Sequence, residues 1–263
     1  MSGAELRIRG TTYPPACALL VCASPRVGST LVCDELARTD VLGYPKEYFF
    51  PASEQACAEA WGLSDPELDP VGYRRAVLRD GTSPNQLFAA KIMWSQLPHL
   101  THRLGHCPDR APTAIREGFP LPSALVLSRR DRVAAAVSEH RAELTGLWSA
   151  TAGAPSRNPA VQDFDIRRVT ELHDLQHWAD EGWPVLLSEA GVPYRQHYYE
   201  DWQPDPFPVA ADAAALLGME LPRPTGPPSA LVPQRDQTNR AVASWFWATT
   251  EGCPTCPRPV ATS

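Results

Sequence analysis

The sequence predicts an α/β fold with three layers, in which a central parallel sheet lies between two layers of helices. Four short segments rich in β-forming residues, the first three of them largely apolar, alternate along the chain with segments of helical periodicity. The first of them, Ala18 to Ala23, is apolar throughout, which is typical of a strand buried on both faces. The chain has 263 residues, 43% of them hydrophobic and 21% charged, which is enough for one large domain with a substantial core. We expect a single domain over 1–263, with a polar leader at 1–16 and a flexible tail at 249–263.

The expected elements follow one another in a regular order. The four strands are expected at residues 18–23, 87–94, 124–127 and 194–202. Helices are expected over 29–39, about 70–79, 96–107, 133–144, about 165–180, about 184–190 and 209–217, with a last helix inside 231–249. Loops are expected over 107–122 and 149–163, and the polar segment 51–85 is expected to hold only the helix near 70–79.

The segment CALLVCASPRVGSTLVC, residues 17–33, organises the rest of the chain. It combines a buried strand, a tight turn SPRVGST and the first turn of a helix. Gly28 allows a close approach of the backbone, and Ser29 and Thr30 can cap or begin the helix. Such a loop directs backbone N–H groups and the positive end of a helix dipole at one small volume, which favours an anion. The alternative is that SPRVGST is only a turn between a strand and a helix.

The loop differs in two ways from the nucleotide-binding motif GxxxxGK[ST]. Ala23 stands in place of the first glycine, and no lysine follows Gly28. That lysine normally reaches the β- and γ-phosphates of a nucleoside triphosphate, so a triphosphate is a poor fit. We expect a cradle for one phosphate, with Arg26 as its charged donor. The residues of this cradle are Arg26, Val27, Gly28, Ser29 and Thr30.

Composition limits the classes of partner. A formal net charge of −6 and an isoelectric point near 5.6 argue against bulk binding of nucleic acid or of an anionic membrane. No apolar run has the length of a membrane span, and the N-terminal segment lacks the apolar core of a signal peptide, so we expect a cytoplasmic protein. The seven cysteines lack the spacing of a disulfide framework, and we expect the lone pair Cys253 and Cys256 to be free thiols. The histidines complete no convincing metal site, and we expect no metal.

Four other residues lie where a ligand of this loop could reach. Glu47 stands among aromatic residues and could serve as a base, although a solvated loop acid is the common alternative. Lys91 lies inside an apolar strand, which is costly unless the lysine is paired or used; it could also snorkel out of the strand end. Arg130 ends the third strand, and Ser138 lies on the second turn of the next helix. Because ligands bind at the carboxyl edge of such sheets, these two could clamp a second phosphate beside the first.

Six of these segments, in the same order, resemble the bacterial trehalose 2-sulfotransferase family. They are ASPRVGSTLV, PKEYF, KIMW, SRRDRVAAAVSEHRAELTGLW, YYEDW and QRDQTNRAVASWF, and they cover residues from about 17 to 247. The resemblance implies the sulfotransferase fold, which is similar to that of P-loop nucleotide kinases. It also implies the donor 3′-phosphoadenosine 5′-phosphosulfate (PAPS), the product adenosine 3′,5′-bisphosphate (PAP), and a homodimer. No metal is needed, since a sulfuryl group carries less charge than a phosphoryl group.

The resemblance also implies where the donor binds. The 5′-phosphosulfate would lie in the loop at residues 26–30, and the 3′-phosphate would lie against Arg130 and Ser138. Arg235 and Asn239 match a polar C-terminal motif of the family and would close over the donor, with a solvated loop as the alternative.

The reaction that the resemblance implies is an in-line displacement. Glu47 matches the proposed base of the family and would take the proton of a sugar hydroxyl. The loop N–H groups, with Arg26 and Ser29, would stabilise charge on the sulfuryl group and on the leaving phosphate. Lys91 would help to neutralise the leaving group.

The acceptor is less defined than the donor. Tyr48, Trp94 and Trp148 are candidates for stacking on a sugar, although most large aromatic residues of a domain belong to its core. The sequence departs from the usual family pattern at Pro25 and Lys46, near the expected acceptor side. A glycoside other than trehalose, or a sugar-bearing secondary metabolite, therefore fits as well as trehalose.

Two other classes of function remain open. A small-molecule kinase of the same fold would bind ATP with magnesium and would not bind PAP. A non-catalytic nucleotide-binding protein would keep every measurable property when Glu47 is replaced by alanine.

Overall fold

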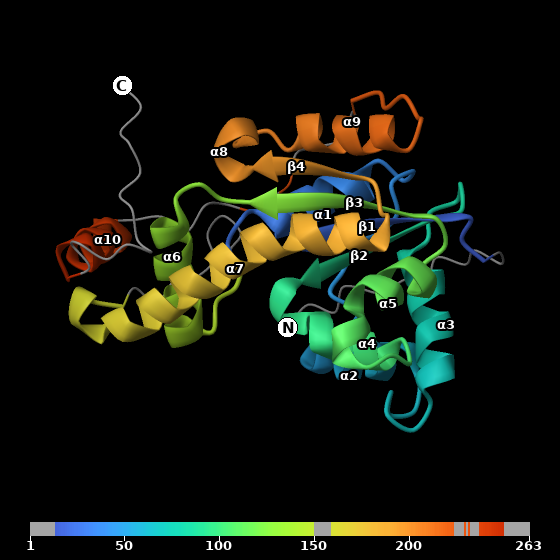
Figure 1. The fold of residues 1–263 in the computed structure, drawn as a ribbon, viewed down its shortest axis with the longest axis horizontal. Helices are drawn as coiled ribbons and strands as arrows, with labels where there is room; N and C mark the ends of the chain where they lie inside the picture. Colours follow the sequence, from blue (N-terminus) through green and yellow to red (C-terminus); the bar gives the residue numbers. More distant parts are fainter. Residues whose placement is uncertain (1–13, 150–158, 224–228, 230, 232–236, 250–263) are drawn as a thin grey trace.

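A parallel sheet of four strands forms the centre of the described part of the chain, which comprises residues 14–149, 159–223, 229, 231 and 237–249 of a computed structural model (Figure 1). The strands are β1 (Cys17–Ala23), β2 (Leu87–Met93), β3 (Pro122–Ser128) and β4 (Tyr194–Tyr198). Their order across the sheet is β2-β1-β3-β4, and each neighbouring pair is parallel. The predicted α/β fold is confirmed, and its four strands lie where the sequence indicates.

The register of the sheet brings several loops to one edge. Ala23 at the end of β1 pairs with Met93 of β2 and with Leu127 of β3, and Ser128 pairs with Tyr198 of β4. The strands therefore end level with one another, and the segments that follow them start at the same edge. Ligands of open α/β sheets bind at this carboxyl edge. The register thus brings most of the predicted site residues into one region.

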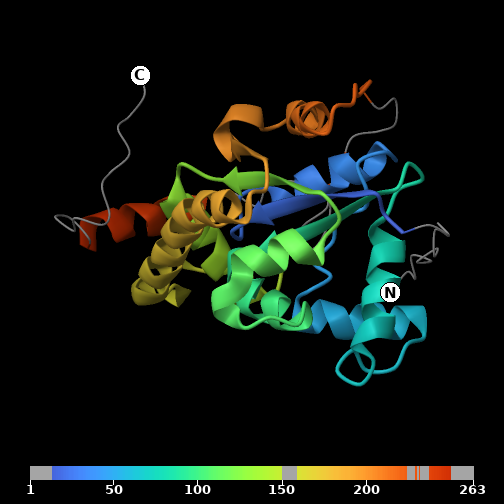
Figure 2. The same cartoon turned by 45° about the vertical axis from the view of Figure 1, so that its right-hand side comes forward.

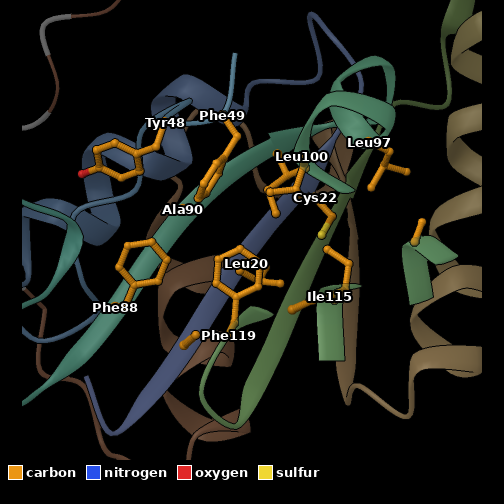
Figure 3. Packing of buried hydrophobic residues seen from close by; sticks show 14 of the residues in the cluster. Leu20, Cys22, Tyr48, Phe49, Phe88, Ala90, Leu97, Leu100, Ile115 and Phe119 are labelled. Atoms are coloured by element: carbon orange, nitrogen blue, oxygen red, sulfur yellow. The ribbon is translucent and has the colours of Figure 1, made fainter. Parts of the chain in front are cut away.

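One face of the sheet carries the larger hydrophobic core. Leu20 and Cys22 of β1 pack there with Phe88 and Ala90 of β2 (Figure 3). Five helices cover this face: α2 (Pro51–Trp61), α3 (Pro70–Gly81), α4 (Leu97–Arg103), α5 (Ala111–Gly118) and the C-terminal half of α7 (Ile166–Ala190). Short 3-10 turns lie at Trp94–Gln96, Pro108–Arg110 and Val161–Asp163.

The opposite face carries the second core, because successive strand residues point to opposite sides of a sheet. Leu19, Val21 and Ala23 of β1 contribute to it. The helices on this face are α1 (Ser29–Arg38), α8 (Tyr199–Trp202) and α9 (Phe207–Leu216). The sheet is therefore the middle of three layers, as predicted.

A third core lies beside the sheet and contains no strand residue. It joins α6 (Arg132–Thr145), the N-terminal half of α7, and α10 (Gln237–Thr249). Val137, Leu172 and Phe246 are fully or almost fully buried at its centre. Figures 1 and 2 both show these three helices grouped at one end of the molecule.

Two helices lie where the sequence predicts loops, and those two predictions are wrong. Within 51–85, α2 buries Glu54, Ala58 and Trp61, which recur at helical spacing but include a charged residue and so form a weak apolar pattern. Within 107–122, Pro108 lies in the first turn of a 3-10 helix and Pro112 in the first turn of α5. A proline is tolerated in a first turn because its missing N–H has no intrahelical acceptor there.

Two other boundaries differ from the prediction. The helices expected at 165–180 and 184–190 form one helix, α7, which continues through Pro184. Trp183 and Leu187 on either side of the proline are buried against the sheet, and this packing outweighs the lost backbone hydrogen bond. The strand expected over 194–202 ends at Tyr198, where the short helix α8 begins.

Several predictions lie outside the described residues. They concern most of the leader, the central part of the loop at 149–163, Arg235, the cysteine pair Cys253 and Cys256, and the tail after 249. Across the described ranges, none of the helices combines the length and the apolar character that crossing a bilayer requires.

Candidate active site

The loop that joins β1 to α1, residues 24–28, is called the anion loop below. Gly28, with a φ angle of 80°, is the N-cap of α1, and no side chain from the described residues caps this helix. The N–H group of Leu31 already donates to the carbonyl oxygen of Gly28 at 3.0 Å, whereas those of Ser29 and Thr30 precede the first bond of the helix. The positive end of the helix dipole faces the loop. Ser24 Oγ of the loop is buried and has no hydrogen-bond partner among the described residues. These donors are suited to a small anion.

Gly28 is fixed by its neighbours as well as by its backbone angles. A Cβ atom at this position would lie 2.6 Å from the ring of Trp202 and 2.8 Å from that of Tyr199. The two aromatic rings of α8 thus pack directly on the backbone of the anion loop. Any larger residue at position 28 would push α8 away from α1.

Arg26 reaches from the anion loop to α6. Its Nε donates a hydrogen bond to Ser138 Oγ at 2.9 Å, and its Nη1 donates to the carbonyl oxygen of Trp148. Burial lowers the pKa of its guanidinium. In turn, Arg129 donates from Nη1 to the carbonyl oxygen of Arg26 at 3.2 Å. These contacts hold the cation of the loop against the helix that follows β3.

Glu47 and Lys91 form an ion pair at the end of β2. Lys91 Nζ lies 2.7 Å from Glu47 Oε1 and donates to Thr30 Oγ1 at 3.4 Å. The backbone N–H of Lys91 donates to the carbonyl oxygen of Lys46 at 2.9 Å, which fixes this segment beside the strand. The Lys91 side chain is buried, whereas 26% of the Glu47 side chain is exposed. The carboxylate is thus open to a small molecule, and Lys91 links it to the first turn of α1.

Gln96 holds the second oxygen of the Glu47 carboxylate, a contact that sequence reasoning missed. Its Nε2 donates to Glu47 Oε2 at 2.7 Å, and its own Oε1 accepts from the backbone N–H of Met93 at 3.2 Å. The second bond fixes which end of the amide faces Glu47. Gln96 is buried and directly precedes α4. It is 49 residues from Glu47 in the sequence, so no local pattern indicates the contact.

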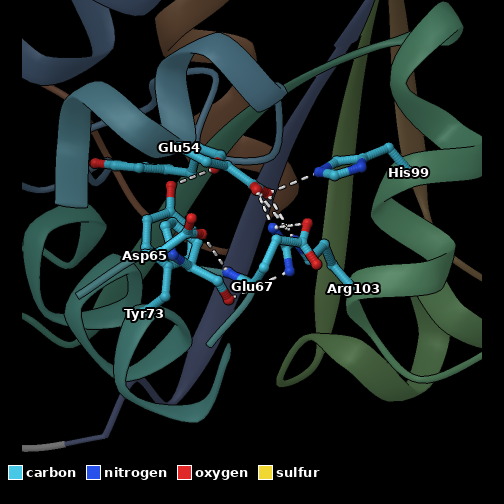
Figure 4. Close-up of polar contacts among 8 residues, drawn as sticks. Glu54, Asp65, Glu67, Tyr73, His99 and Arg103 are labelled. Atoms are coloured by element: carbon cyan, nitrogen blue, oxygen red, sulfur yellow. Dashed lines mark hydrogen bonds and ion pairs between the residues drawn. The ribbon is translucent and has the colours of Figure 1, made fainter. Parts of the chain in front are cut away.

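A buried ion pair joins the two helices that follow Glu47 and Gln96 (Figure 4). Glu54 of α2 accepts from Arg103 Nη2 of α4 at 2.6 Å and from Arg103 Nε at 3.0 Å. His99 Nε2 lies 2.9 Å from the same carboxylate. We call Glu54, His99 and Arg103 the α2–α4 clamp. It fixes the relative position of the segments that carry Glu47 and Gln96.

The structure does not bring Arg130 and Ser138 together as a pair. Arg130 donates to both carboxylate oxygens of Asp201, at 2.6 and 2.7 Å, and its guanidinium lies 4.3 Å from the centre of the Tyr198 ring. The hydrogen bonds that Arg130 donates to Asp201 raise the pKa of Arg130. Ser138 instead accepts from Arg26. Both side chains lie beyond the carboxyl edge of the sheet, but each has another partner.

Glu139 is a buried acid next to Ser138 that sequence reasoning also missed. Its Oε2 accepts from Gln176 Nε2 of α7 at 3.0 Å, and burial raises its pKa to about 7. The positive charge of Arg26 opposes this shift. A glutamate inside the alanine-rich run VAAAVSEH is the only signal in the sequence that could have indicated a buried acid.

The three predicted aromatic contacts have different positions. Tyr48 is fully buried in the larger core, and its hydroxyl donates to Asp80 Oδ2 at 2.8 Å. Tyr48 therefore has no surface on which a substrate could stack, and we correct that expectation. Trp94 packs edge-on against Trp183, with ring centres 5.2 Å apart. Trp148 is 52% exposed, and its carbonyl group contacts Arg26.

The remaining predicted contacts involve α10 and the histidines. Asn239 at the start of α10 accepts from Arg141 Nη1 of α6 at 3.1 Å, while Arg235 lies outside the described residues. Within the described ranges, no group of three or more His, Cys, Asp or Glu side chains could hold a metal ion.

Comparison with known proteins identifies the family of the chain. The family model of the Stf0 sulphotransferases matches residues 18–248. A trehalose 2-sulfotransferase of Mycolicibacterium smegmatis is 30% identical over 200 residues, which are 66% of this chain and 74% of that protein. A trehalose 2-sulfotransferase of Mycobacterium tuberculosis is 28% identical over 198 residues, which are 66% and 73% of the two chains.

A sulfotransferase from Alicyclobacillus acidocaldarius of known crystal structure aligns with 90% of this chain and 93% of its own, with a TM-score of 0.47 and 13% identity. The family model spans all four strands of the sheet, the anion loop, the Glu47–Lys91 pair and α6. The resemblance found in the sequence motifs is therefore confirmed, and the chain belongs to the Stf0 sulphotransferase family.

Proposed function

We propose that this sulfotransferase transfers a sulfuryl group from PAPS to a hydroxyl group of a sugar or of a glycosylated small molecule. The observation that carries the proposal is the series of contacts from Glu47 through Lys91 to Thr30, at 2.7 and 3.4 Å. It joins a carboxylate that can accept a proton to the first turn of the helix at the anion loop. The two relatives named as trehalose 2-sulfotransferases support a sugar as the acceptor.

The 5′-phosphosulfate of the donor is assigned to the anion loop. Ser24 Oγ and the N-terminus of α1, which have neither a hydrogen-bond partner nor a side-chain cap in the described part of the chain, supply donors for it. Gly28 has no side chain, so the backbone can approach the anion closely. Arg26 adds a positive charge, and Val27, Ser29 and Thr30 complete the proposed cradle.

The 3′-phosphate is assigned to Ser138 and Arg130. Arg130 is exposed and would exchange the carboxylate of Asp201 for the phosphate, which offers the same bidentate geometry. Asn239 lies on this side through its bond to Arg141, and Arg235 is proposed as a further contact of the same C-terminal segment.

The proposed reaction is an in-line displacement. When bound, PAPS supplies the sulfuryl group, and a bond from the acceptor oxygen to sulfur forms as the S–O bond to the 5′-phosphate breaks and its electron pair leaves with PAP. Glu47 accepts the proton of the acceptor hydroxyl. Lys91 places an ammonium group between Glu47 and Thr30, where it offsets negative charge on the leaving side. Arg26 and Ser29 stabilise charge at the anion loop.

The acceptor is proposed to bind on the exposed side of Glu47. The indole of Trp148 is exposed and offers a flat apolar face for a sugar ring. Trp94, which directly follows β2, is proposed as a second aromatic wall. Because the sequence departs from the family pattern in this region, a glycoside other than trehalose is an equally suitable acceptor.

Thermal unfolding with added nucleotides tests the donor. We expect PAP to raise the melting temperature and ATP with magnesium to leave it unchanged, since the anion loop lacks the lysine that holds a triphosphate. A ligand present at 100 times its Kd stabilises a protein by about 2.7 kcal/mol, which such an assay resolves. Stabilisation by ATP and not by PAP would overturn the proposal in favour of a kinase.

Replacement of the base tests the chemistry. Glu47→Gln should keep the stabilisation by PAP and should slow sulfuryl transfer from labelled PAPS at least about 100-fold, the usual contribution of a general base. Glu59→Gln, an exposed glutamate of α2 that contacts Gln55, is the matched control and should transfer at the wild-type rate. Equal transfer rates of Glu47→Gln and Glu59→Gln would show that Glu47 is not the base of the reaction.

A further inference from the structure

Behind the anion loop lies a buried pair of side chains that the proposed reaction does not use. Glu139 of α6 and Gln176 of α7 are joined by a hydrogen bond of 3.0 Å, and only 8% and 2% of these residues are exposed. Gln176 Nε2 also donates to the carbonyl oxygen of Pro25 at 3.5 Å. The pair thus connects two helices to the backbone of the anion loop, one residue before Arg26.

Arg26 contacts the residue of α6 that precedes Glu139. Ser138, the neighbour of Glu139 on α6, accepts from Arg26 Nε. Arg26 and Glu139 also interact electrostatically, because each shifts the pKa of the other toward its charged form. Glu139 is buried and has little access to water. The positive charge of Arg26 therefore acts both on the carboxylate of Glu139 and on any anion in the anion loop.

The charged groups around Glu139 come from three elements. Arg26 of the anion loop and Arg168 of α7 favour its ionised form, whereas Glu143 of α6 disfavours it. Arg168 is engaged by Glu143 itself, at 2.6 Å, so its charge is already neutralised locally. Arg26 is the facing cation whose charge an anion in the loop would neutralise.

The other groups near this region face different partners. On α6, His140 pairs with Glu143 at 3.1 Å, and Arg141 donates to Asn239 of α10. The positive charge of Arg141 also contributes to the lowered pKa of Arg26. On α7, the ring of His173 packs against Phe246 of α10, with ring centres 5.6 Å apart.

We propose that Glu139 takes up a proton from solvent when an anion occupies the anion loop, and that Glu139 and Gln176 together position Arg26 for that anion. This inference rests on the proposed function, since it assigns PAP as the anion. Before binding, Arg26 offsets the negative charge of a buried carboxylate. After binding, the charge of Arg26 is shared with the phosphate, the carboxylate loses its counter-charge, and protonation relieves the buried negative charge.

The direction of the linkage follows from the pKa of Glu139. A pKa of about 7 leaves the group close to half protonated at pH 7, and a bound anion raises the pKa further. PAP binding at pH 7 should therefore take up about half a proton through Glu139. Affinity for PAP should fall as the pH rises above 7, because binding takes up a proton and the concentration of free protons is then lower.

Calorimetry in two buffers of different ionisation enthalpy measures this proton directly, without an acceptor or a catalytic turnover. The experiment compares PAP binding at pH 7 to the wild type, to Glu139→Gln and to Glu189→Gln, an exposed residue near the C-terminal end of α7. The phosphate groups of PAP release or take up the same number of protons with each variant. We expect Glu139→Gln to take up about half a proton less than the other two, while its melting temperature shows that it is folded.

A second variant tests the positioning of Arg26. Gln176→Met keeps the length of the side chain but removes both hydrogen bonds, and it should weaken PAP binding at least about tenfold. Equal proton uptake by the wild type and Glu139→Gln, with PAP bound to both, would overturn this inference and leave the assignment of the donor intact. Failure of the wild type to bind PAP would overturn the donor assignment and this inference with it.

Discussion

Two residues of the anion loop adopt a left-handed backbone conformation, and each is held there in a different way. Gly28 has no Cβ and adopts its φ angle of 80° without strain. Arg26 has a φ angle of 65°, which costs a residue with a side chain about 1 kcal/mol. The bonds from Arg26 to Ser138 and Trp148 offset that cost and aim the guanidinium at α6. Backbone strain in the loop thus coincides with its proposed anion contact.

The replacement Gly28→Ala should damage the anion loop and not only its stability. The new Cβ would collide with Trp202 and Tyr199, so α8 has to move and the first turn of α1 shifts with it. We expect PAP binding to weaken at least about tenfold, together with a loss of about 1–2 kcal/mol from the left-handed conformation. Calorimetry with PAP and chemical denaturation measure the two effects.

Gly62→Ala is the matched control. Gly62 also has a positive φ, 67°, but a Cβ there would have no atom within 4 Å. It should lose a similar amount of stability to strain and should bind PAP like the wild type. If both variants bind PAP equally well, the packing of α8 on Gly28 plays no part in the anion site.

Single residues were predictable where the residues next to them in the sequence already indicate their role. Arg26 and Gly28 lie in a short segment whose own residues indicate a turn and an anion site. Lys91 stands out because it is a charged residue in an otherwise apolar strand. Gln96 and Glu139 were missed, because their significance depends on partners far away in the sequence. Tyr48 was misjudged, because an aromatic residue next to Glu47 has the same local pattern whether it faces a cleft or the core.

At the scale of elements, strands were easier to predict than helices. β1 and β3 are largely apolar runs, and Lys91 is the one charged residue of β2, because burial on both faces of the sheet favours that pattern. The last strand in the sheet order, β4, is more polar and partly exposed. The helices α2 and α5 were missed because α2 buries a charged residue and α5 has a proline in its first turn. The charge on α2 is Glu54, and its partner Arg103 lies on another helix 49 residues later. Tertiary pairing thus determines the face of α2, and a single segment cannot reveal it.

The α2–α4 clamp should be a main source of stability for this layer of the fold. Arg103→Met would leave Glu54 buried without its strongest counter-charge, and the loss of one partner from a buried pair costs about 3–5 kcal/mol. Arg116→Met, which breaks an exposed pair with Glu117, should change stability by less than about 1 kcal/mol. Denaturant unfolding compares the two.

The clamp variants also separate stability from donor binding. The added replacement Glu54→Gln should recover part of the stability lost in Arg103→Met, because it removes the unpaired charge. PAP binding should stay close to that of the wild type in the folded variants, since the hydrogen bonds and ion pairs of the clamp join α2, α4 and residues 66–67. A loss of PAP affinity equal to that of Gly28→Ala would show that α2 and α4 contribute to the donor site.

At the scale of the whole molecule, the two halves of the proposed site rest on different cores. Glu47, Lys91 and Gln96 lie beside the two cores that pack on the faces of the sheet. Ser138 and Glu139 lie on α6, which the third core joins to α7 and α10. The third core is smaller and includes no strand residue. The acceptor side and part of the donor side are therefore stabilised by separate sets of contacts.

This division predicts that Phe246→Ala acts on the donor side alone. Phe246 of α10 is fully buried in the third core, and loss of such a side chain costs about 3–5 kcal/mol. Hydrogen exchange should accelerate in α6, α10 and the first half of α7, while β1 to β3 keep their protection, because the sheet has its own two cores. PAP should bind at least about tenfold more weakly.

Trp245→Ala, on the partly exposed face of the same helix, should leave exchange and binding close to wild type. Equal acceleration in the strands and in α6 would mean that the three cores unfold as one cooperative unit, and the donor side would then share the stability of the sheet.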